Sequence, residues 1–244
     1  MRSGNPSLKD DKFIRSTSAD NGRLMTIQGT VNKTLILLLL VLATFIYSWS
    51  QFLNDPASVT PLVLAGAIGG FIVALVTIFV PKISPITAPI YALLEGLFIG
   101  AISAQYEVQF GGIVFQAVLL TIGVLLSLLL AYKSGFIKVT QNFRLGVFAA
   151  TGAVFVVYLI SFIGGFFGFQ IPYLHEASPI GIAISVVIVI IAALNLVLDF
   201  DYIENAAAKR VPKYFEWYGA FGLLVTLIWL YLEILRLLSK IRSR

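Results

Sequence analysis

The stretch PIGIAISVVIVIIAALNLVLDFDYIEN, residues 179–205, decides the fold class of this chain. Residues 179–198 contain only two polar side chains, and about 20 apolar residues in a helix cross the hydrocarbon core of a bilayer. The stretch therefore predicts a membrane-spanning helix. It ends, however, on Asp199, Asp201 and Glu204, and carboxylates at such a position require a partner in the protein or in water.

The composition extends this interpretation to the whole chain. Of its 244 residues, 59% are hydrophobic and only 12% are charged, whereas about a quarter of the residues of a soluble domain are charged. We therefore interpret the chain as an integral membrane protein whose main partner is the lipid bilayer. The net charge of +5 does not indicate a nucleic-acid partner, because the basic residues cluster beside hydrophobic segments, where positive charge sets membrane topology.

Seven apolar stretches are long enough to span a membrane. They cover roughly residues 34–54, 61–80, 87–105, 112–132, 144–168, 179–200 and 215–238. Because these runs are continuous and not alternating, they exclude a transmembrane β-barrel. The predicted fold class is an all-α integral membrane protein, a seven-helix bundle.

The polar ends define the predicted domains. Residues 1–24 are polar and mixed in charge, which predicts a mobile cytosolic tail without a fold of its own. Residues 25–240 form the predicted membrane domain, and residues 241–244 form a basic C-terminal tail.

Lys and Arg predict a cytoplasmic N-terminus, because they gather in the leader and in alternate connections, whereas the opposite connections contain none. Four basic residues at or beyond the end of the seventh helix conflict with this rule: Arg236, Lys240, Arg242 and Arg244. Either the last helix is re-entrant or buried with its orientation set by packing, or the earlier charges dominate. We favour a complete crossing by a centrally buried helix.

Glu95 is the acidic residue that lies deepest in a predicted helix. It is about 12 Å from the start of the third helix at 1.5 Å per residue. An ionised carboxylate in hydrocarbon costs a few kcal/mol, so we interpret Glu95 as a pore or ion-binding residue. The alternative is a protonated or hydrogen-bonded structural glutamate.

Asp199 closes a polar and small-residue face of the sixth helix. This face follows spacings of three and four residues and consists of Gly181, Ser185, Ile188, Ala192, Asn195 and Asp199. Asp201 lies about 200° around the helix from Asp199, so only one of the two faces the bundle. Asn195 and Asp201 are further pore or ion-binding candidates. The alternative for Asp201 and Glu204 is a pair of solvated acids at the helix end.

The seventh helix carries acids near both ends. Glu216 enters from the same side as Asp199, and the short loop 201–213 predicts that the two helix ends meet. Two carboxylates that lie close together can share a proton, so we predict Asp199 as the proton-sensing gating residue and Glu216 as its partner. Glu233 precedes Arg236 by three positions, which predicts a structural ion pair.

The sequence contains no recognisable catalytic constellation. It has no cysteine and a single histidine, His175, and it lacks a metal-binding His pair, a phosphate-cradling loop and a nucleophile elbow. We therefore expect no enzymatic activity and no cofactor. Carboxylates are hard oxygen donors that suit Ca²⁺, which makes Glu95 and Asp199 the candidate metal ligands.

Several segments resemble the Bax inhibitor/YccA family, also called the transmembrane Bax inhibitor motif family. LDFDYI (198–203), a basic loop and a final helix ending in LYLEILRLL (230–238) resemble its C-terminal part. YALLEGLFIGAIS (91–103) resembles its third helix. MTIQGTVNKT (25–34) and EWYGAFGLLVTLIWLYLEILRLL (216–238) are similar to its bacterial subgroup, and the resemblance covers about residues 25–240.

The resemblance implies a bundle whose last helix is surrounded by the other six, in a bacterial plasma membrane. It further implies a pH-responsive calcium leak that is controlled by hydrogen-bonded carboxylates near the cytosolic mouth. Asp199 resembles the sixth-helix aspartate of the family. Thr226, however, occupies the usual position of the second aspartate, and residues 61–80 lack the arginine that can accompany the pair. A carboxylate pair must therefore use Glu216 or Glu95 as the partner of Asp199, or other groups than a carboxylate pair control the leak in this chain.

Two functions follow as expectations. The first is a pH-sensitive cation leak channel, with calcium as the transported ion. The second, which the YccA branch of the family suggests, is a non-conducting regulator that binds another membrane protein, such as a quality-control protease.

Overall fold

The computed structural model describes residues 24–168, 171–172, 174 and 176–243. The predicted tail up to residue 23 and His175 lie outside the described residues. The long helices are α2 (Ile27–Asn54), α5 (Ser84–Gln109), α6 (Ile113–Lys133), α7 (Gln141–Phe166), α8 (Pro179–Ala208) and α9 (Phe215–Arg242). The remaining span is built from η2 (Pro56–Val59), α3 (Thr60–Leu64), the π-helical turn η3 (Ala65–Gly69) and α4 (Gly70–Phe79), and η4 (Pro81–Ile83) follows it.

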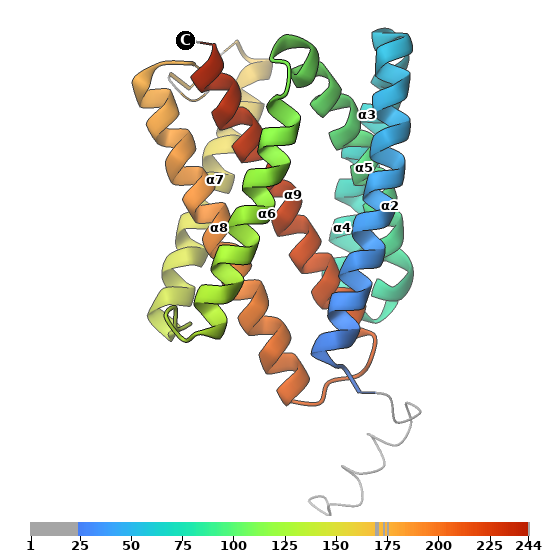
Figure 1. The fold of residues 1–244 in the computed structure, drawn as a ribbon, viewed down its shortest axis with the longest axis vertical. Coiled ribbons are helices and arrows are strands. Elements are labelled where there is room, and N and C mark those ends of the chain that lie inside the picture. Colours follow the sequence, from blue (N-terminus) through green and yellow to red (C-terminus); the bar gives the residue numbers. More distant parts are fainter. Residues whose placement is uncertain (1–23, 169–170, 173, 175, 244) are drawn as a thin grey trace, which may run out of the picture.

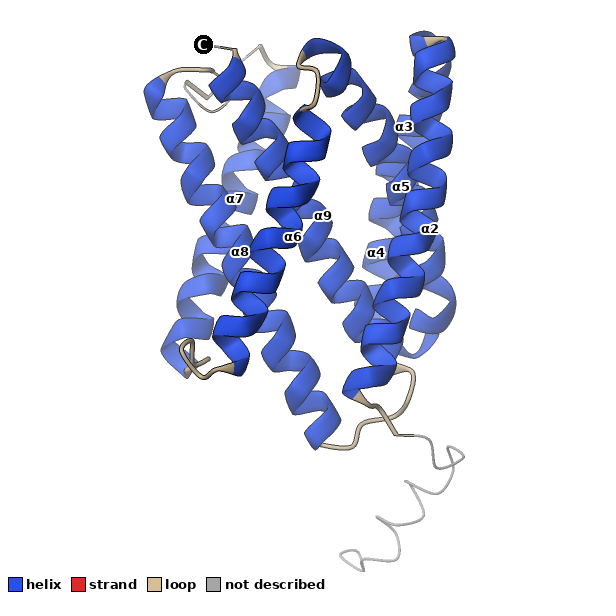
Figure 2. Cartoon of the chain, viewed as in Figure 1, coloured by secondary structure: helices blue, strands red, loops and turns tan. Residues whose placement is uncertain are grey.

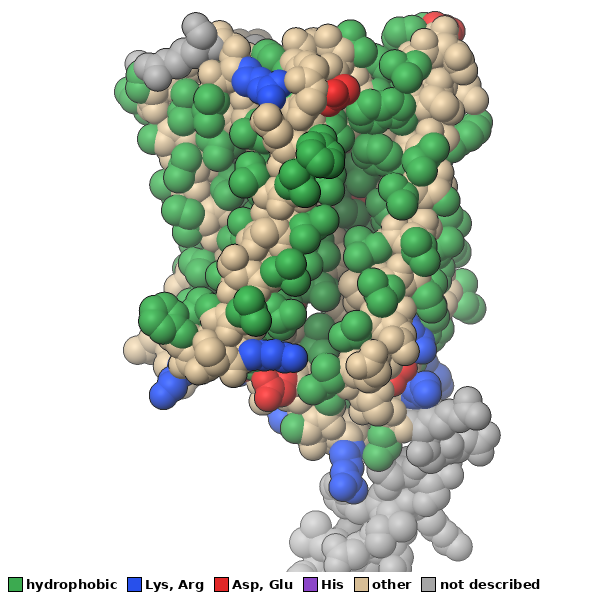
Figure 3. Space-filling model, viewed as in Figure 1, with side chains coloured by type: hydrophobic (Ala, Val, Ile, Leu, Met, Phe, Trp, Pro, Cys, Tyr) green, Lys and Arg blue, Asp and Glu red, His purple; other side chains and the backbone are tan. Residues whose placement is uncertain are grey.

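These elements confirm the predicted fold class. Seven helical segments of the described chain are long and apolar enough to cross a membrane, and helices make up nearly all of its regular structure (Figure 2). The isolated β-bridge between Leu24 and Pro212 is a short exception. Large apolar side chains cover the outside of the bundle (Figure 3), as expected where lipid replaces water as the solvent.

The last helix, α9, is the centre of the bundle. It crosses completely between the other helices (Figure 1) and packs against α2, α5, α6 and α8. Leu224, Leu230 and Leu235 on α9 are fully buried. This arrangement confirms the complete, centrally buried crossing. Below, the N-terminal end of the bundle is the end at which α2 begins, and the C-terminal end is the end at which α9 stops.

The helix α8 runs eight residues beyond its predicted end. Ser178 caps its first turn by accepting a hydrogen bond from the Gly181 N–H, and Pro179 occupies the first helical position. At the other end, Ile203 and Ala206 are buried in a small cluster with Met25. Because these contacts hold the last two turns of α8, residues 201–208 form helix and not the predicted loop.

The closest helix packing joins α2 and α5 through two glycines. A Cβ atom built on Gly96 would lie 2.0 Å from Thr44 Oγ1, and one built on Gly100 would lie 2.5 Å from the Phe45 carbonyl oxygen. Such distances are possible only without a side chain. The Gly96 and Gly100 pair thus lets the two backbones approach, as small residues do in membrane helices.

Candidate functional site

The carboxylate of Asp199 points into the bundle, toward α9. The Thr226 side chain lies near it, and a Cβ atom built on Gly222 would lie 3.9 Å from its Oδ1. Its Oδ2 is inaccessible to solvent and has no hydrogen-bond partner among the described residues. The inward orientation that the spacing on α8 predicts is therefore present, and one carboxylate oxygen is left unsatisfied.

Thr226 gives this contact two alternative hydrogen-bonding patterns. Its hydroxyl also lies 3.3 Å from the Gly222 carbonyl oxygen, to which it can donate. A hydroxyl has only one proton to donate. Facing an ionised Asp199, Thr226 could donate to the carboxylate at the expense of its bond to the Gly222 carbonyl. Facing a protonated Asp199, it can accept the acid proton and keep its bond to Gly222. The direction of a hydrogen bond between Asp199 and Thr226 would therefore depend on whether Asp199 carries a proton.

Glu216 does not meet Asp199, which corrects the predicted carboxylate pair. Glu216 is 1% exposed and accepts hydrogen bonds from the Thr26 N–H at 3.1 Å and from the Thr26 hydroxyl at 3.0 Å. The Lys33 ammonium lies 3.5 Å from its Oε2. The carboxylate thus lies at the N-termini of both α2 and α9, where the helix dipoles favour negative charge.

The length of α8 explains why Asp199 and Glu216 do not form the predicted pair. Because the helix continues to Ala208, Asp199 is nine residues, about 13 Å, from its end. Glu216 lies at the start of α9, and Thr226 is ten residues, about 15 Å, farther along that helix. The short loop joins Ala208 to Phe215, and so it does not bring Asp199 to Glu216.

Glu95 lies on the other side of the bundle, half-buried between α5 and α4. It lies near the Tyr91 side chain on its own helix, and a Cβ atom on Gly70 would lie 3.0 Å from its Oε1. Gly70 directly follows the π-helical turn η3, a feature frequent at functional sites.

The candidate metal ligands Glu95 and Asp199 contact different helices. Within the described ranges, no three His, Cys, Asp or Glu side chains lie close enough to hold a metal ion together. Glu95 and Asp199 thus belong to no such group of three among the described residues.

The other two pore candidates have local structural partners. Asp201 forms an ion pair with Arg144 at 2.6 Å, which ties α8 to the start of α7. Asn195 donates hydrogen bonds to the Thr151 hydroxyl and to the Ile191 carbonyl oxygen, both at 2.8 Å. These contacts attach α8 to α7 and do not place either side chain with Asp199.

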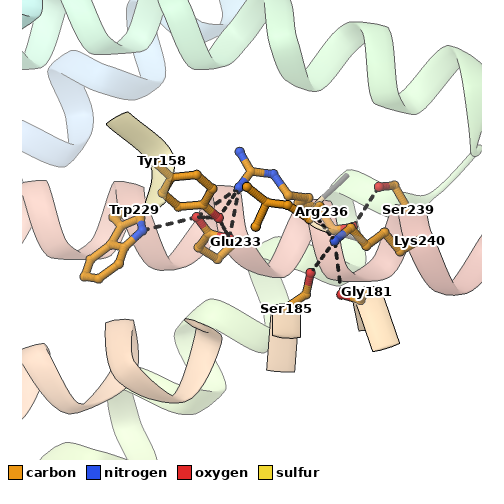
Figure 4. A network of polar contacts seen from close by, with 9 residues as sticks. Tyr158, Gly181, Ser185, Trp229, Glu233, Arg236, Ser239 and Lys240 are labelled. Atoms are coloured by element: carbon orange, nitrogen blue, oxygen red, sulfur yellow. Dashed lines mark hydrogen bonds and ion pairs between the residues drawn. The ribbon is translucent and has the colours of Figure 1, made fainter. Parts of the chain in front are cut away.

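A second polar cluster lies in the C-terminal half of α9 (Figure 4). Glu233 is 2% exposed, and Arg236 lies 3.3 Å from its Oε1, so the predicted ion pair is present. Tyr158 on α7 donates to Glu233 at 3.0 Å, and Trp229 Nε1 donates at 3.2 Å. Arg236 also donates to the Tyr158 hydroxyl. Sequence reasoning missed Tyr158, which is 75 residues away from Glu233.

Lys240 is a buried cation, which the sequence analysis counted only as one of the four basic residues that follow the seventh helix. It is 5% exposed, and its Nζ donates to the Leu174 carbonyl at 2.7 Å, the Ser185 hydroxyl at 2.8 Å and the Gly181 carbonyl at 3.1 Å (Figure 4). All three ammonium protons are thus used. Its spacing of seven residues from Glu233 places both on one helix face, a signal that could have indicated burial.

Arg242 also has protein partners, since it donates to the carbonyl oxygens of Phe110 and Gly111 and to the Gln116 side chain. The helix α9 includes Ile241 and Arg242, so it extends past the predicted boundary at residue 240. Among the described residues, Arg236, Lys240 and Arg242 thus all have partners within the bundle, whereas Arg244 lies outside the described residues.

Comparison with known proteins gives one match. The family model described as Bax inhibitor 1 like matches residues 5–243, nearly the whole chain. No curated protein and no solved structure matches. The matched region includes all seven spans and therefore both polar clusters on α9.

Proposed function

This chain belongs to the Bax inhibitor 1 like family, and on that premise we propose that it is a pH-sensitive leak pathway for cations, with calcium as the transported ion. The observation that carries this proposal is the Asp199 carboxylate, which faces α9 and keeps one buried oxygen without a partner. An ionised carboxylate in such surroundings is costly, so it gains free energy by binding a proton or a passing cation.

The proton and the cation compete for the same oxygens. With a proton on Asp199, the acid donates to Thr226 and the α8–α9 contact is neutral. Without it, the carboxylate is a hard oxygen donor of the kind that Ca²⁺ prefers. In this proposal Asp199 senses protons, and its partner across the α8–α9 contact is Thr226 and not a second acid.

In this proposal, a layer of buried apolar side chains closes the path. Leu196 and Leu230 are fully buried and Leu227 is 7% exposed, in one cluster beside Asp199. Hydrophobic constrictions block ions because a dry passage offers no ligands. Conduction therefore requires α8 and α9 to shift relative to each other, and the hydrogen bond that the proton redirects lies between these two helices.

The location that we propose is a bacterial plasma membrane, with the N-terminus in the cytoplasm. The asymmetry of Lys and Arg supports this orientation. The exceptions Arg236, Lys240 and Arg242 have partners in the protein and so do not oppose it. Asp199 then belongs to the cytoplasmic half of α8.

Calcium flux across a pH series tests the proposal. Purified protein is reconstituted into liposomes that contain a calcium indicator, and the leak rate is measured from pH 5 to pH 8. Flux should depend on pH, and Asp199→Asn should abolish that dependence, because Asn has the same shape and cannot titrate. The control Asp55→Asn replaces an exposed acid and should behave like the parent protein. Absence of flux at every pH would refute the leak and favour the non-conducting regulator.

A further inference from the structure

A deep cleft separates α2 from α6 at the N-terminal end of the bundle. Its volume is about 760 Å³, within the range of sites that enclose small ligands. The helices α2 and α6 form its walls, and Phe200 and Ile203 of α8 with Leu223 and Leu227 of α9 line it from behind. The space-filling view shows the hollow between the two helices (Figure 3).

The length of the cleft matches one leaflet of a bilayer. On α2 its lining runs from Ile27 to Leu38, eleven residues or about 16 Å along the helix. Half of a hydrocarbon core of roughly 30 Å is about 15 Å. The wall residues Leu35 and Leu126 are more than half exposed, so the cleft is accessible from the side, where the lipid lies.

The mouth of the cleft carries charge, whereas its interior is apolar. Lys133 and Lys138 line the mouth, and neither has an ion pair within the part of the chain that the structure describes. The two carboxylates there are already engaged. Asp201 is paired with Arg144, and Glu204 accepts a hydrogen bond of 2.5 Å from the Tyr132 hydroxyl.

These charged side chains give the mouth of the cleft a net positive charge. Three cations, Lys133, Lys138 and Arg144, face two carboxylates, and the two lysines are exposed. Basic groups at the headgroup level attract anionic lipids. An apolar cleft as long as one leaflet, with unpaired lysines at its interfacial end, has the chemistry of a phospholipid site.

We propose that the cleft between α2 and α6 binds one anionic phospholipid from the leaflet at the N-terminal end. One acyl chain lies along the apolar lining, and Lys133 and Lys138 bind the phosphate. This site does not require ion conduction, because neither Asp199 nor Thr226 lines the cleft, although Leu227 belongs both to its lining and to the apolar layer.

Native mass spectrometry of the delipidated protein in detergent tests the site, with phosphatidylglycerol and phosphatidylcholine as probes. We expect one phosphatidylglycerol to bind more tightly than any further copy and more tightly than phosphatidylcholine. The double variant Lys133→Gln/Lys138→Gln should weaken that first binding step about tenfold or more, since each lysine near a membrane surface contributes substantially to anionic lipid binding.

Two further variants distinguish lipid binding in the cleft from general attraction of the lipid by surface charge. Lys209→Gln/Lys213→Gln removes two exposed lysines at the same end that do not line the cleft, and it should bind phosphatidylglycerol like the parent protein. Leu35→Trp places a bulky ring at an exposed wall position and should weaken binding while both lysines remain. Equal binding of the two lipids, or unchanged binding by the Lys133 and Lys138 double variant, would overturn the proposal.

Discussion

Thr226 on α9 lies beside the buried carboxylate of Asp199 on α8. This contact joins the central helix to its neighbour at the position where the family places a second aspartate, as the sequence resemblance implies. A hydroxyl cannot carry the charge of a carboxylate, but it can donate or accept. In the proposed function, the Asp199 and Thr226 contact would therefore remain sensitive to a proton with only one titrating member.

Replacing Thr226 tests that coupling. Thr226→Val keeps the shape and removes the hydroxyl, so at neutral pH it should lower the free energy of unfolding by about 1–2 kcal/mol. In the background of Asp199→Leu the same replacement should cost clearly less, because the partner is already absent. Unfolding in detergent of the two single variants and the double variant gives the coupling energy. Strictly additive effects would show that the contact does not contribute.

Glu216→Gln tests whether Glu216 has a structural role at the start of α2 or a role in proton sensing. The neutral amide weakens the hydrogen bonds with Thr26 and the ion pair with Lys33, so hydrogen exchange at the Thr26 and Gly29 amides should become faster. The pH dependence of calcium flux should stay as in the parent protein, because Glu216 lies about 15 Å from Thr226 along α9. A flux profile that loses its pH dependence would instead restore Glu216 as the partner of Asp199.

Gly96→Ala should be strongly destabilising. The new methyl group would lie 2.0 Å from Thr44 Oγ1 and 2.4 Å from the Val41 carbonyl oxygen, which forces α2 away from α5 at a cost of roughly 1–3 kcal/mol. Gly123→Ala on α6 is the matched control, since no described neighbour lies within 4 Å of its Cβ position. That replacement should be neutral or slightly stabilising. Thermal unfolding in detergent compares the two variants.

Lys240→Met should destabilise the C-terminal half of the bundle by about 2 kcal/mol or more. Methionine fills similar space but leaves the Leu174 and Gly181 carbonyl oxygens and the Ser185 hydroxyl without their donor, and buried polar groups without partners are costly. Lys213→Met, at an exposed position, should have almost no effect. Equal melting temperatures for both variants would show that the Lys240 contacts contribute no net stability.

Local patterns in the sequence were sufficient to predict much of the fold and the orientation of some residues of the candidate site. The apolar runs predicted seven spans because each must hydrogen-bond its own backbone in lipid. Spacings of three and four residues predicted that Asp199 faces inward and that Glu233 pairs with Arg236, since both depend only on the geometry of one helix.

Partners that lie far apart along the chain depended on the packing of the bundle. Glu216 binds Thr26, which is 190 residues away, and Lys240 binds Ser185, which is 55 residues away. The extension of α8 that separates Asp199 from Glu216 depends on the burial of Ile203 against Met25. The sequence by itself determined the membrane as solvent, the number of spans and the face that each acid presents. Only the tertiary structure decided which group each acid meets, because those contacts form when separate helices pack.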